Sequence, residues 1–262
     1  MKDKKIYYYS DELEDDFVPP KNKTRVIDGS FNYIHKNFFW NIAEFFVYRI
    51  IMMPFASVYN KIKFRHKIVG KGKLKIVKKS GYFMYANHTI ADGDAFIPNR
   101  VNAPRKTYTI VHPSNLSHKI GNNFLRMCGG TPLPSDIPAT KNFISALEYF
   151  SNKGCAIQIY PEAHIWPYYT NIRPFKESSF RYPVKFDKPV FCFTNTFHQR
   201  RKGKVKVITY IDGPFYADKT LPQKEQEKKL RDEVYNAMIE RAKLNTYEFV
   251  TYIKKQEDAD KI

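Results

Sequence analysis

The sequence predicts an α/β protein: a single layered domain with a mixed, partly parallel sheet flanked by helices, preceded by an amphipathic N-terminal helical segment. After residue 80, short apolar runs typical of strands alternate with runs that have helical spacing. Between residues 31 and 54, large apolar side chains recur every three or four positions. The chain has 262 residues, of which 43% are hydrophobic, which is enough to bury one core and excludes disorder throughout.

The distribution of charge divides the chain into four segments. Residues 1–20 hold six acids and three lysines and are expected to form an acidic flexible leader. Residues 21–60 form the amphipathic helical segment, residues 61–250 the main domain, and residues 251–262 a polar tail. The leader has acids where a secretory signal needs an apolar region, so we expect the protein to stay in the cytosol.

The amphipathic helix is expected to begin near Phe31 and to end near Pro54. Its apolar side is rich in phenylalanine, and two interpretations of that side remain open: it packs into the core, or it binds an anionic membrane surface. A membrane-spanning helix needs about 18 uncharged apolar residues. Because Lys36, Glu44 and Arg49 interrupt this stretch, any membrane contact should be interfacial.

Positive charge is concentrated beside this helix. The formal net charge is +18, and residues 21–80 contain fourteen Lys and Arg but only two acids. From Lys61 to Lys79, basic residues alternate with apolar ones, which predicts a basic β-hairpin that turns at residues 70–72. Such a surface favours an anionic membrane or, as a further alternative, a nucleic acid as partner.

The main domain is predicted to contain five strands and four helices. The strands cover residues 82–86, 108–112, 155–160, 190–195 and 204–211, and the helices cover residues 94–101, 117–127, 139–152 and 224–243. The last helix has Leu230, Val234 and Met238 on one side among many charged residues. It is therefore expected to close the domain.

Two of these strands lead directly into residues that can do chemistry. Asn87 and His88 follow the first strand, with Asp92 and Asp94 close behind, and Glu162 follows the third strand. Ligands of open α/β sheets bind at the carboxyl ends of the strands, so we expect His88 and Glu162 at the same edge. A carboxylate beside His88 would fix its tautomer, as in a general base, and a purely structural hydrogen bond is the alternative.

Cations near Glu162 and three scattered cysteines complete the candidate chemistry. Arg173 and Lys176 follow Glu162 in the sequence and would supply positive charge to an anionic substrate. The cysteines lie far apart and have no metal-ligand spacing. We therefore expect neither a metal site nor a disulfide framework.

Together these residues resemble the motifs of the glycerophospholipid acyltransferase family, which contains the 1-acylglycerol-3-phosphate O-acyltransferases. The resemblance covers residues 60–245. It rests on three blocks: Asn87-His88 followed by Asp94, the run Tyr160 to Ala163 (Tyr-Pro-Glu-Ala), and the strand Lys188 to Phe193. Their order and spacing are more specific than any one block.

The spacing of the first block departs from the family pattern. The family has its acid five residues after the histidine, whereas here Asp92 lies four and Asp94 six residues after His88. We favour Asp94, because the residues after it match the start of the family's helix and Gly93 offers the backbone freedom that an inserted residue needs. Asp92 remains the alternative acid.

Two further positions also differ from the family. Ser135 stands where the family has an arginine that contacts the acceptor's phosphate. Any phosphate must then be held by other cations, for which Arg126, Lys141, Arg173 and Lys176 are candidates. Ala163 replaces a glycine and is expected to narrow the space beside Glu162.

The resemblance implies a peripheral membrane enzyme at the cytoplasmic face of the membrane. It would move a fatty acyl group from acyl-CoA or acyl carrier protein to the hydroxyl of a lysophospholipid, lysophosphatidate-like acceptor in glycerophospholipid synthesis. It implies no cofactor other than this thioester donor. Residues 61–250 would be the acyltransferase domain and residues 21–60 a membrane-associating segment.

The resemblance also implies roles for single residues. His88 would be the general base and Asp94 would orient its ring, whereas Asn87, Glu162, Arg173 and Lys176 would bind substrate, with no metal involved. Two other functions stay open: a catalytically silent relative that binds membranes, and a basic nucleic-acid-binding protein. Because the sequence has no recognised nucleic-acid motif and its aromatics lie mainly in apolar runs, we expect no nucleic acid among its partners.

Overall fold

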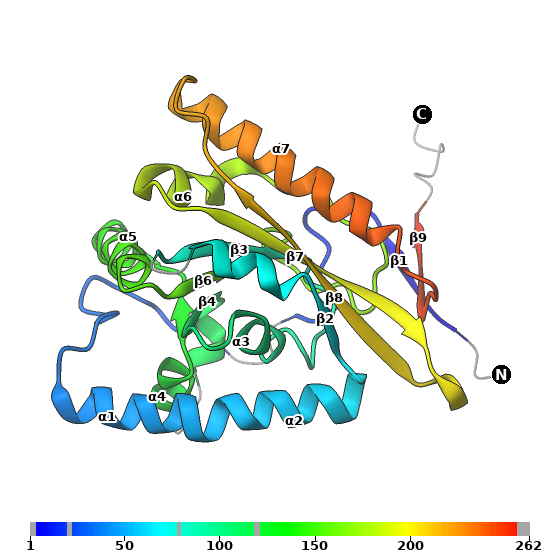
Figure 1. Cartoon of the computed structure of the whole chain (residues 1–262), viewed down its shortest axis with the longest axis horizontal. Helices are drawn as coiled ribbons and strands as arrows, with labels where there is room; N and C mark the ends of the chain where they lie inside the picture. Colours follow the sequence, from blue (N-terminus) through cyan, green and yellow to red (C-terminus); the bar gives the residue numbers. More distant parts are fainter. Residues whose placement is uncertain (1–3, 20–22, 78–79, 118–120, 256–262) are drawn as a thin grey trace.

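The computed structural model describes residues 4–19, 23–77, 80–117 and 121–255. The parts of the predicted leader, basic hairpin, second domain helix and tail that fall on other residues lie outside this description. Figure 1 shows a central sheet with helices on both sides, a long helix along its lower border, and a small separate pair of strands at the right. The predicted α/β class is confirmed.

The central sheet has seven strands in the order β2-β8-β7-β3-β6-β4-β5. Their bounds are β2 Lys67–Val69, β3 Tyr82–Ala86, β4 Thr107–Val111, β5 Gly130–Pro132, β6 Ala156–Ile159, β7 Val190–Gln199 and β8 Val205–Phe215. The five strands from β7 to β5 are parallel, β8 is antiparallel to β7, and β2 is parallel to β8. The sheet is therefore mixed and partly parallel, as expected.

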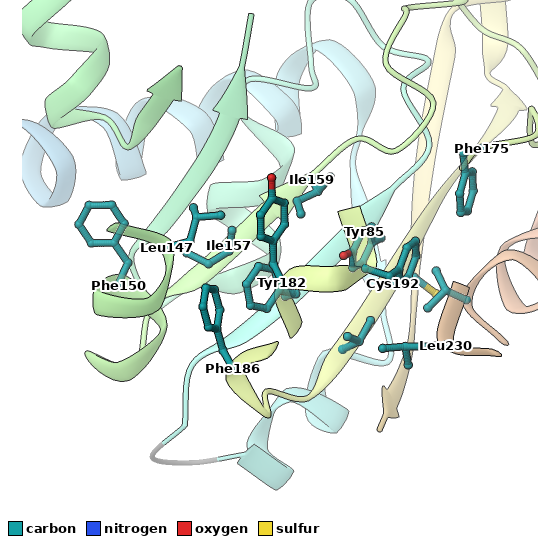
Figure 2. Packing of buried hydrophobic residues seen from close by; sticks show 14 of the residues in the cluster. Tyr85, Leu147, Phe150, Ile157, Ile159, Phe175, Tyr182, Phe186, Cys192 and Leu230 are labelled. Atoms are coloured by element: carbon teal, nitrogen blue, oxygen red, sulfur yellow. The ribbon is translucent and has the colours of Figure 1, made fainter. Parts of the chain in front are cut away.

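Helices cover both faces of this sheet. Their bounds are α3 Ile97–Asn102, α4 Gly121–Met127, α5 Ile137–Asn152, α6 Arg181–Phe186 and α7 Gln223–Ala242. Alternate residues of β3 face opposite layers: Phe83 and Tyr85 pack with α5, α6 and α7, whereas Tyr82 and Met84 pack with α3 and the end of the long helix. Figure 2 shows the first layer, with Leu147, Phe186 and Leu230 beside the strand residues.

The long helix differs from its predicted bounds. It consists of α1 (Phe38–Phe46), six π-helical residues (Val47–Met52) and α2 (Met53–Phe64). It begins later than expected because the Asn37 side chain caps it, accepting a hydrogen bond from the Trp40 N–H at 3.1 Å. Pro54 does not end the helix, because it follows the π-helical residues, whose wider turn gives the proline ring room.

One helix in the described part of the chain, Phe38–Phe64, is long and apolar enough to cross a membrane by length and composition, with a mean hydropathy of 1.4 in its most apolar window. From the sequence, we expected this stretch to contain too many charged residues for a membrane-spanning helix. The late start leaves Lys36 outside the helix, and Glu44 is neutralised by an ion pair with Lys106. Only 17% of that window is buried inside the protein.

The predicted basic hairpin is wrong. Residues up to Phe64 continue α2, Arg65 ends that helix in a left-handed conformation (φ 44°), and residues 71–77 form a 3-10 helix. Of residues 61–77, only Lys67–Val69 form a strand, and it pairs with β8 rather than with a second basic strand. The alternating pattern does not indicate a hairpin here, because it spans the end of a helix, a short strand and a 3-10 helix and arises by chance.

The leader and the tail also differ from expectation. β1 (Lys5–Tyr9) and β9 (Val250–Lys254) pair in parallel, with Tyr7 opposite Tyr252. Phe17 then packs edge-on against Trp166, with ring centroids 5.2 Å apart. The described part of the leader is thus held by a long-range strand pair, which local charge could not reveal.

The buried His66 gives the fold a pH dependence. Its Nε2 lies 2.7 Å from Thr209 Oγ1, and burial lowers the pKa of the ring from 6.5 to about 3. The unfolded chain therefore takes up a proton between these values that the folded chain does not, so the free energy of unfolding falls as the pH drops below 6.5. At pH 5 this loss amounts to about 2 kcal/mol.

We expect His66→Gln to remove this loss. Between pH 7 and pH 5, urea unfolding should show wild type losing about 2 kcal/mol more than the variant. The exposed His112→Gln is the control. Parallel pH curves for wild type and His66→Gln would contradict the prediction.

Candidate active site

Two neighbouring parallel strands bring the candidate residues together. β3 and β6 pair in register, with Tyr85 opposite Ile159. His88 follows the end of β3 by two residues, and Glu162 follows the end of β6 by three. Glu162 Oε2 accepts a hydrogen bond from the backbone N–H of His88 at 2.9 Å. The two residues therefore lie at one edge of the sheet, as the sequence predicted.

The partner of the His88 ring is Asp94, not Asp92. His88 Nδ1 lies 2.8 Å from Asp94 Oδ2, and Asp94 is 3% exposed. Asp92 points to solvent and pairs instead with Lys63, at 2.6 Å. The chain turns sharply between these acids: a Cβ on Gly93 would lie 2.6 Å from Ile90 Cγ2, so only glycine fits.

The ring of His88 is fixed on one side and open on the other. It stacks on Tyr160, with centroids 4.2 Å apart, and the Tyr160 hydroxyl donates to the backbone carbonyl of Asp94 at 2.7 Å. The His88 side chain remains 17% exposed. Across the described ranges, no residue hydrogen-bonds to its Nε2. With Nδ1–H donated to the carboxylate, the Nε2 lone pair is free to accept a proton.

Burial sets the electrostatics of the Asp94 carboxyl. Burial raises its pKa, and the hydrogen bonds from His88 and from the backbone N–H of Ile90 act in the opposite direction. A positive charge on the neighbouring imidazole would favour the ionised carboxylate further. The pair is thus arranged to stabilise an imidazolium.

Glu162 and Arg173 are buried, which differs from their expected substrate-binding role. Glu162 Oε1 accepts from the backbone N–H of Arg173 at 3.1 Å, and the Arg173 guanidinium lies 3.7 Å from Oε2. Burial raises the pKa of Glu162, while the charge of Arg173 opposes that rise. Both oxygens are engaged by the protein, so this carboxylate holds the two loops rather than a ligand.

Arg173 is also enclosed on its other sides. Its guanidinium donates to the backbone carbonyls of Glu12, Glu162 and His164 and lies 4.9 Å from the centre of the Trp166 ring. The contact with Glu12 comes from the N-terminal segment. Of the two cations predicted near Glu162, Lys176 is the one exposed to solvent.

Asn87 also has a structural place. It is buried, its Oδ1 accepts from the Asn195 N–H at 2.8 Å, and its Nδ2 donates to the Asn195 carbonyl at 3.1 Å. These bonds join the loop after β3 to β7, so its amide is not free for a substrate.

Among the described residues, no group of His, Cys, Asp and Glu is arranged to hold a metal ion.

The two positions that depart from the family pattern have local explanations. Ala163 adopts a left-handed conformation (φ 63°), which favours glycine and strains an alanine. Ser135 Oγ accepts from the Ile27 N–H at 2.9 Å, and its own N–H donates to the Ile27 carbonyl. Ser135 therefore anchors the segment before the long helix.

The residues that support the loop after β3 were not predicted from the sequence. The backbone N–H groups of Trp166 and Tyr168 donate to the carbonyls of His88 and Thr89, and the Trp166 indole donates to the carbonyl of Asp15. The aromatic run from Trp166 to Tyr169 was the available signal, but spacing alone does not tell what it contacts.

The fold is similar to that of a solved enzyme structure. The crystal structure of the 1-acyl-sn-glycerophosphate (LPA) acyltransferase, PlsC, from Thermotoga maritima superposes with a TM-score of 0.58 at 18% identity. The match covers 82% of this chain and 87% of that chain. No protein-family model and no curated protein matches the sequence. The chain therefore shares the fold of that structure.

We expect Glu162→Gln to lower the free energy of unfolding by about 3–5 kcal/mol, because it leaves the buried Arg173 charge without its partner. Asp92→Asn removes an exposed ion pair and should cost at most about 1 kcal/mol. Urea denaturation measures both changes. Equal losses for the two variants would show that Glu162 does not hold the loops together.

Proposed function

We propose that this protein is an O-acyltransferase that transfers a fatty acyl group from a thioester donor, acyl-CoA or acyl carrier protein, to the hydroxyl of a lysophosphatidate-like lysophospholipid. The observation that carries the proposal is the His88–Asp94 pair at the carboxyl edge of the sheet. The acyltransferase fold supports the same reaction. The thioester itself drives acyl transfer, so the proposed reaction needs no resident cofactor.

In the proposed mechanism, Nε2 of His88 removes the proton of the acceptor hydroxyl as its oxygen attacks the thioester carbonyl. The new C–O bond forms, the C–S bond breaks, and the proton passes from Nε2 to the departing thiolate. Asp94 holds Nδ1–H and stabilises the transient imidazolium. Glu162 holds the backbone of His88 in place by accepting its N–H, and does not touch the acceptor.

Lys176 is the proposed contact for an anionic acceptor group. It is exposed, whereas Arg173 is enclosed by protein groups. Lys141 is exposed as well, and Arg126 donates to the carbonyl of Asn32. We therefore propose that exposed lysines, rather than a buried arginine, bind the negatively charged group of the acceptor.

We further propose that the long helix rests on the cytoplasmic face of a membrane. One side of it is apolar and exposed; its members include Phe38, Phe39, Ile42, Phe45, Phe46, Ile50, Ile51, Phe55, Val58 and Ile62. We call these residues the apolar face. Aromatic and aliphatic side chains of this kind bind at the boundary between lipid headgroups and acyl chains.

The opposite side of the helix is fixed to the domain, which favours an interfacial position over a spanning one. The Tyr48 hydroxyl donates to Asn99 Oδ1 at 2.7 Å and accepts from the Thr107 N–H at 2.8 Å. Glu44 pairs with Lys106. A spanning helix would have to break these contacts and leave their polar groups in hydrocarbon.

The catalytic part of the proposal is tested by thiol release from acyl-CoA in the presence of lysophosphatidate. His88→Ala should lower the rate by about 10²- to 10⁴-fold. Asp94→Asn should also lower the rate strongly, whereas Asp92→Asn, the matched control, should stay near wild type. Background release by wild type with every donor and acceptor would favour a silent relative instead.

The membrane part is tested by co-sedimentation with phosphatidylserine vesicles. Phe39→Ser combined with Phe46→Ser removes two exposed aromatics of the apolar face and should weaken binding at least tenfold, since burying each is worth about 1.5–3 kcal/mol. Tyr216→Ser, an exposed aromatic in the connection between β8 and α7, is the control. Unchanged binding of the double variant would rule out the proposed orientation.

A further inference from the structure

The turn between β7 and β8 carries an isolated group of positive charges. Arg200, Arg201, Lys202 and Lys204 lie in the turn and Lys206 lies at the start of β8, with no acid from Thr196 to Ile208. We call these five residues the cationic tip. Arg201, Lys202 and Lys204 are exposed. In the described part of the chain, none of the five belongs to an ion pair, so their charges are available to a partner.

The tip projects from the catalytic edge of the sheet. β3 pairs with β7 only from Val190 to Phe193, but β7 continues to Gln199 in its pairing with β8. Because β3 and β7 are parallel, the extension passes the end of β3 where His88 lies. The cationic tip and the catalytic residues are therefore at the same end of the sheet.

The end of α2 lies beside the tip. β2 follows α2 directly and runs parallel to β8, with Lys67 opposite Ile208. α2 itself contacts β8, the strand that follows the turn. His66 Nε2 is 2.7 Å from Thr209 Oγ1, which holds the two elements together. Figure 1 shows the end of α2 and the hairpin turn at the same lower right border.

The end of α2 also touches the catalytic loop. Lys63 pairs with Asp92 at 2.6 Å, and the Phe64 ring packs beside Gly93. The end of the helix that carries the apolar face thus lies between the loop from His88 to Asp94 and β8, the strand that follows the turn. A surface that binds both the apolar face and the tip would lie next to the catalytic edge.

We propose that the cationic tip is a second membrane contact, which binds the phosphate groups of anionic lipids beside the apolar face. The inference rests on the proposed membrane association and deepens it. Each Lys or Arg near an anionic bilayer strengthens binding several-fold, and the effect is confined to about one Debye length of the surface. Two contacts, one apolar and one electrostatic, fix the orientation and bring the catalytic edge to the lipid surface.

An anionic bilayer fits this tip better than a nucleic acid does. Proteins that bind single-stranded nucleic acids stack bases on exposed aromatic side chains. Residues 198–206 contain no Phe, Tyr or Trp, and the nearby Phe197 is buried. Lipid phosphates need only exposed positive charge.

The test compares two double variants that lose the same charge. Arg201→Gln with Lys204→Gln changes the tip, and Lys224→Gln with Lys228→Gln changes exposed residues of α7, at the upper border of Figure 1. Both are measured by co-sedimentation with phosphatidylserine-containing and with pure phosphatidylcholine vesicles. Thermal melting verifies that each variant folds.

The tip variant should bind phosphatidylserine vesicles on the order of tenfold more weakly than wild type, with phosphatidylcholine binding unchanged and the α7 variant like wild type. Equal losses for the two variants, or none for the tip variant, would overturn the proposal. So would loss of oligonucleotide binding with vesicle binding intact. Thiol release by wild type is scored separately, so the acyltransferase proposal can stand if the tip proposal fails.

Discussion

The geometry of the site depends on the hydrogen bonds that the buried carboxylate of Glu162 accepts. This carboxylate accepts backbone N–H groups from His88 and from Arg173, and so ties the ends of β3 and β6 to each other and to the loop beyond. Because a buried carboxylate is stable only with such partners, the two loops can scarcely move apart without exposing or stranding a charge. The position of the His88 ring follows from this fixed backbone, and Asp94 then sets its orientation.

Much of this arrangement was predictable from the sequence, for physical reasons that vary from residue to residue. Apolar runs predicted β3 and β6, because buried parallel strands are apolar throughout. The carboxyl ends of these strands predicted that His88 and Glu162 lie at one edge of the sheet. The preference for Asp94 over Asp92 agrees with the observed pairing. The direction of the Glu162 carboxylate was not predictable, because it depends on Arg173, which is itself held by the backbone carbonyl of Glu12, far away in the chain.

Three of the errors share one cause, which is a partner distant in the sequence. The acidic leader reads as flexible from its charge, yet Lys5–Tyr9 is a strand because Val250–Lys254 lies beside it. The basic stretch after Lys61 reads as a hairpin, yet its single strand pairs with β8. The long helix was predicted to be interrupted by charge, yet Glu44 is neutralised by Lys106, the residue before β4. In each case the partner is distant in sequence, so local periodicity carries no information about it.

In the proposed site, His88 keeps a proton on Nδ1 for Asp94 and an unprotonated Nε2 for the acceptor. Nitrogen NMR of the His88 ring at neutral to mildly alkaline pH measures this directly. We expect a protonated, pyrrole-like Nδ1 with a strongly downfield proton and a pyridine-like Nε2, a pattern lost in Asp94→Asn and retained in Asp92→Asn. A proton on Nε2 in the wild-type protein, or the same spectrum in Asp94→Asn, would contradict it.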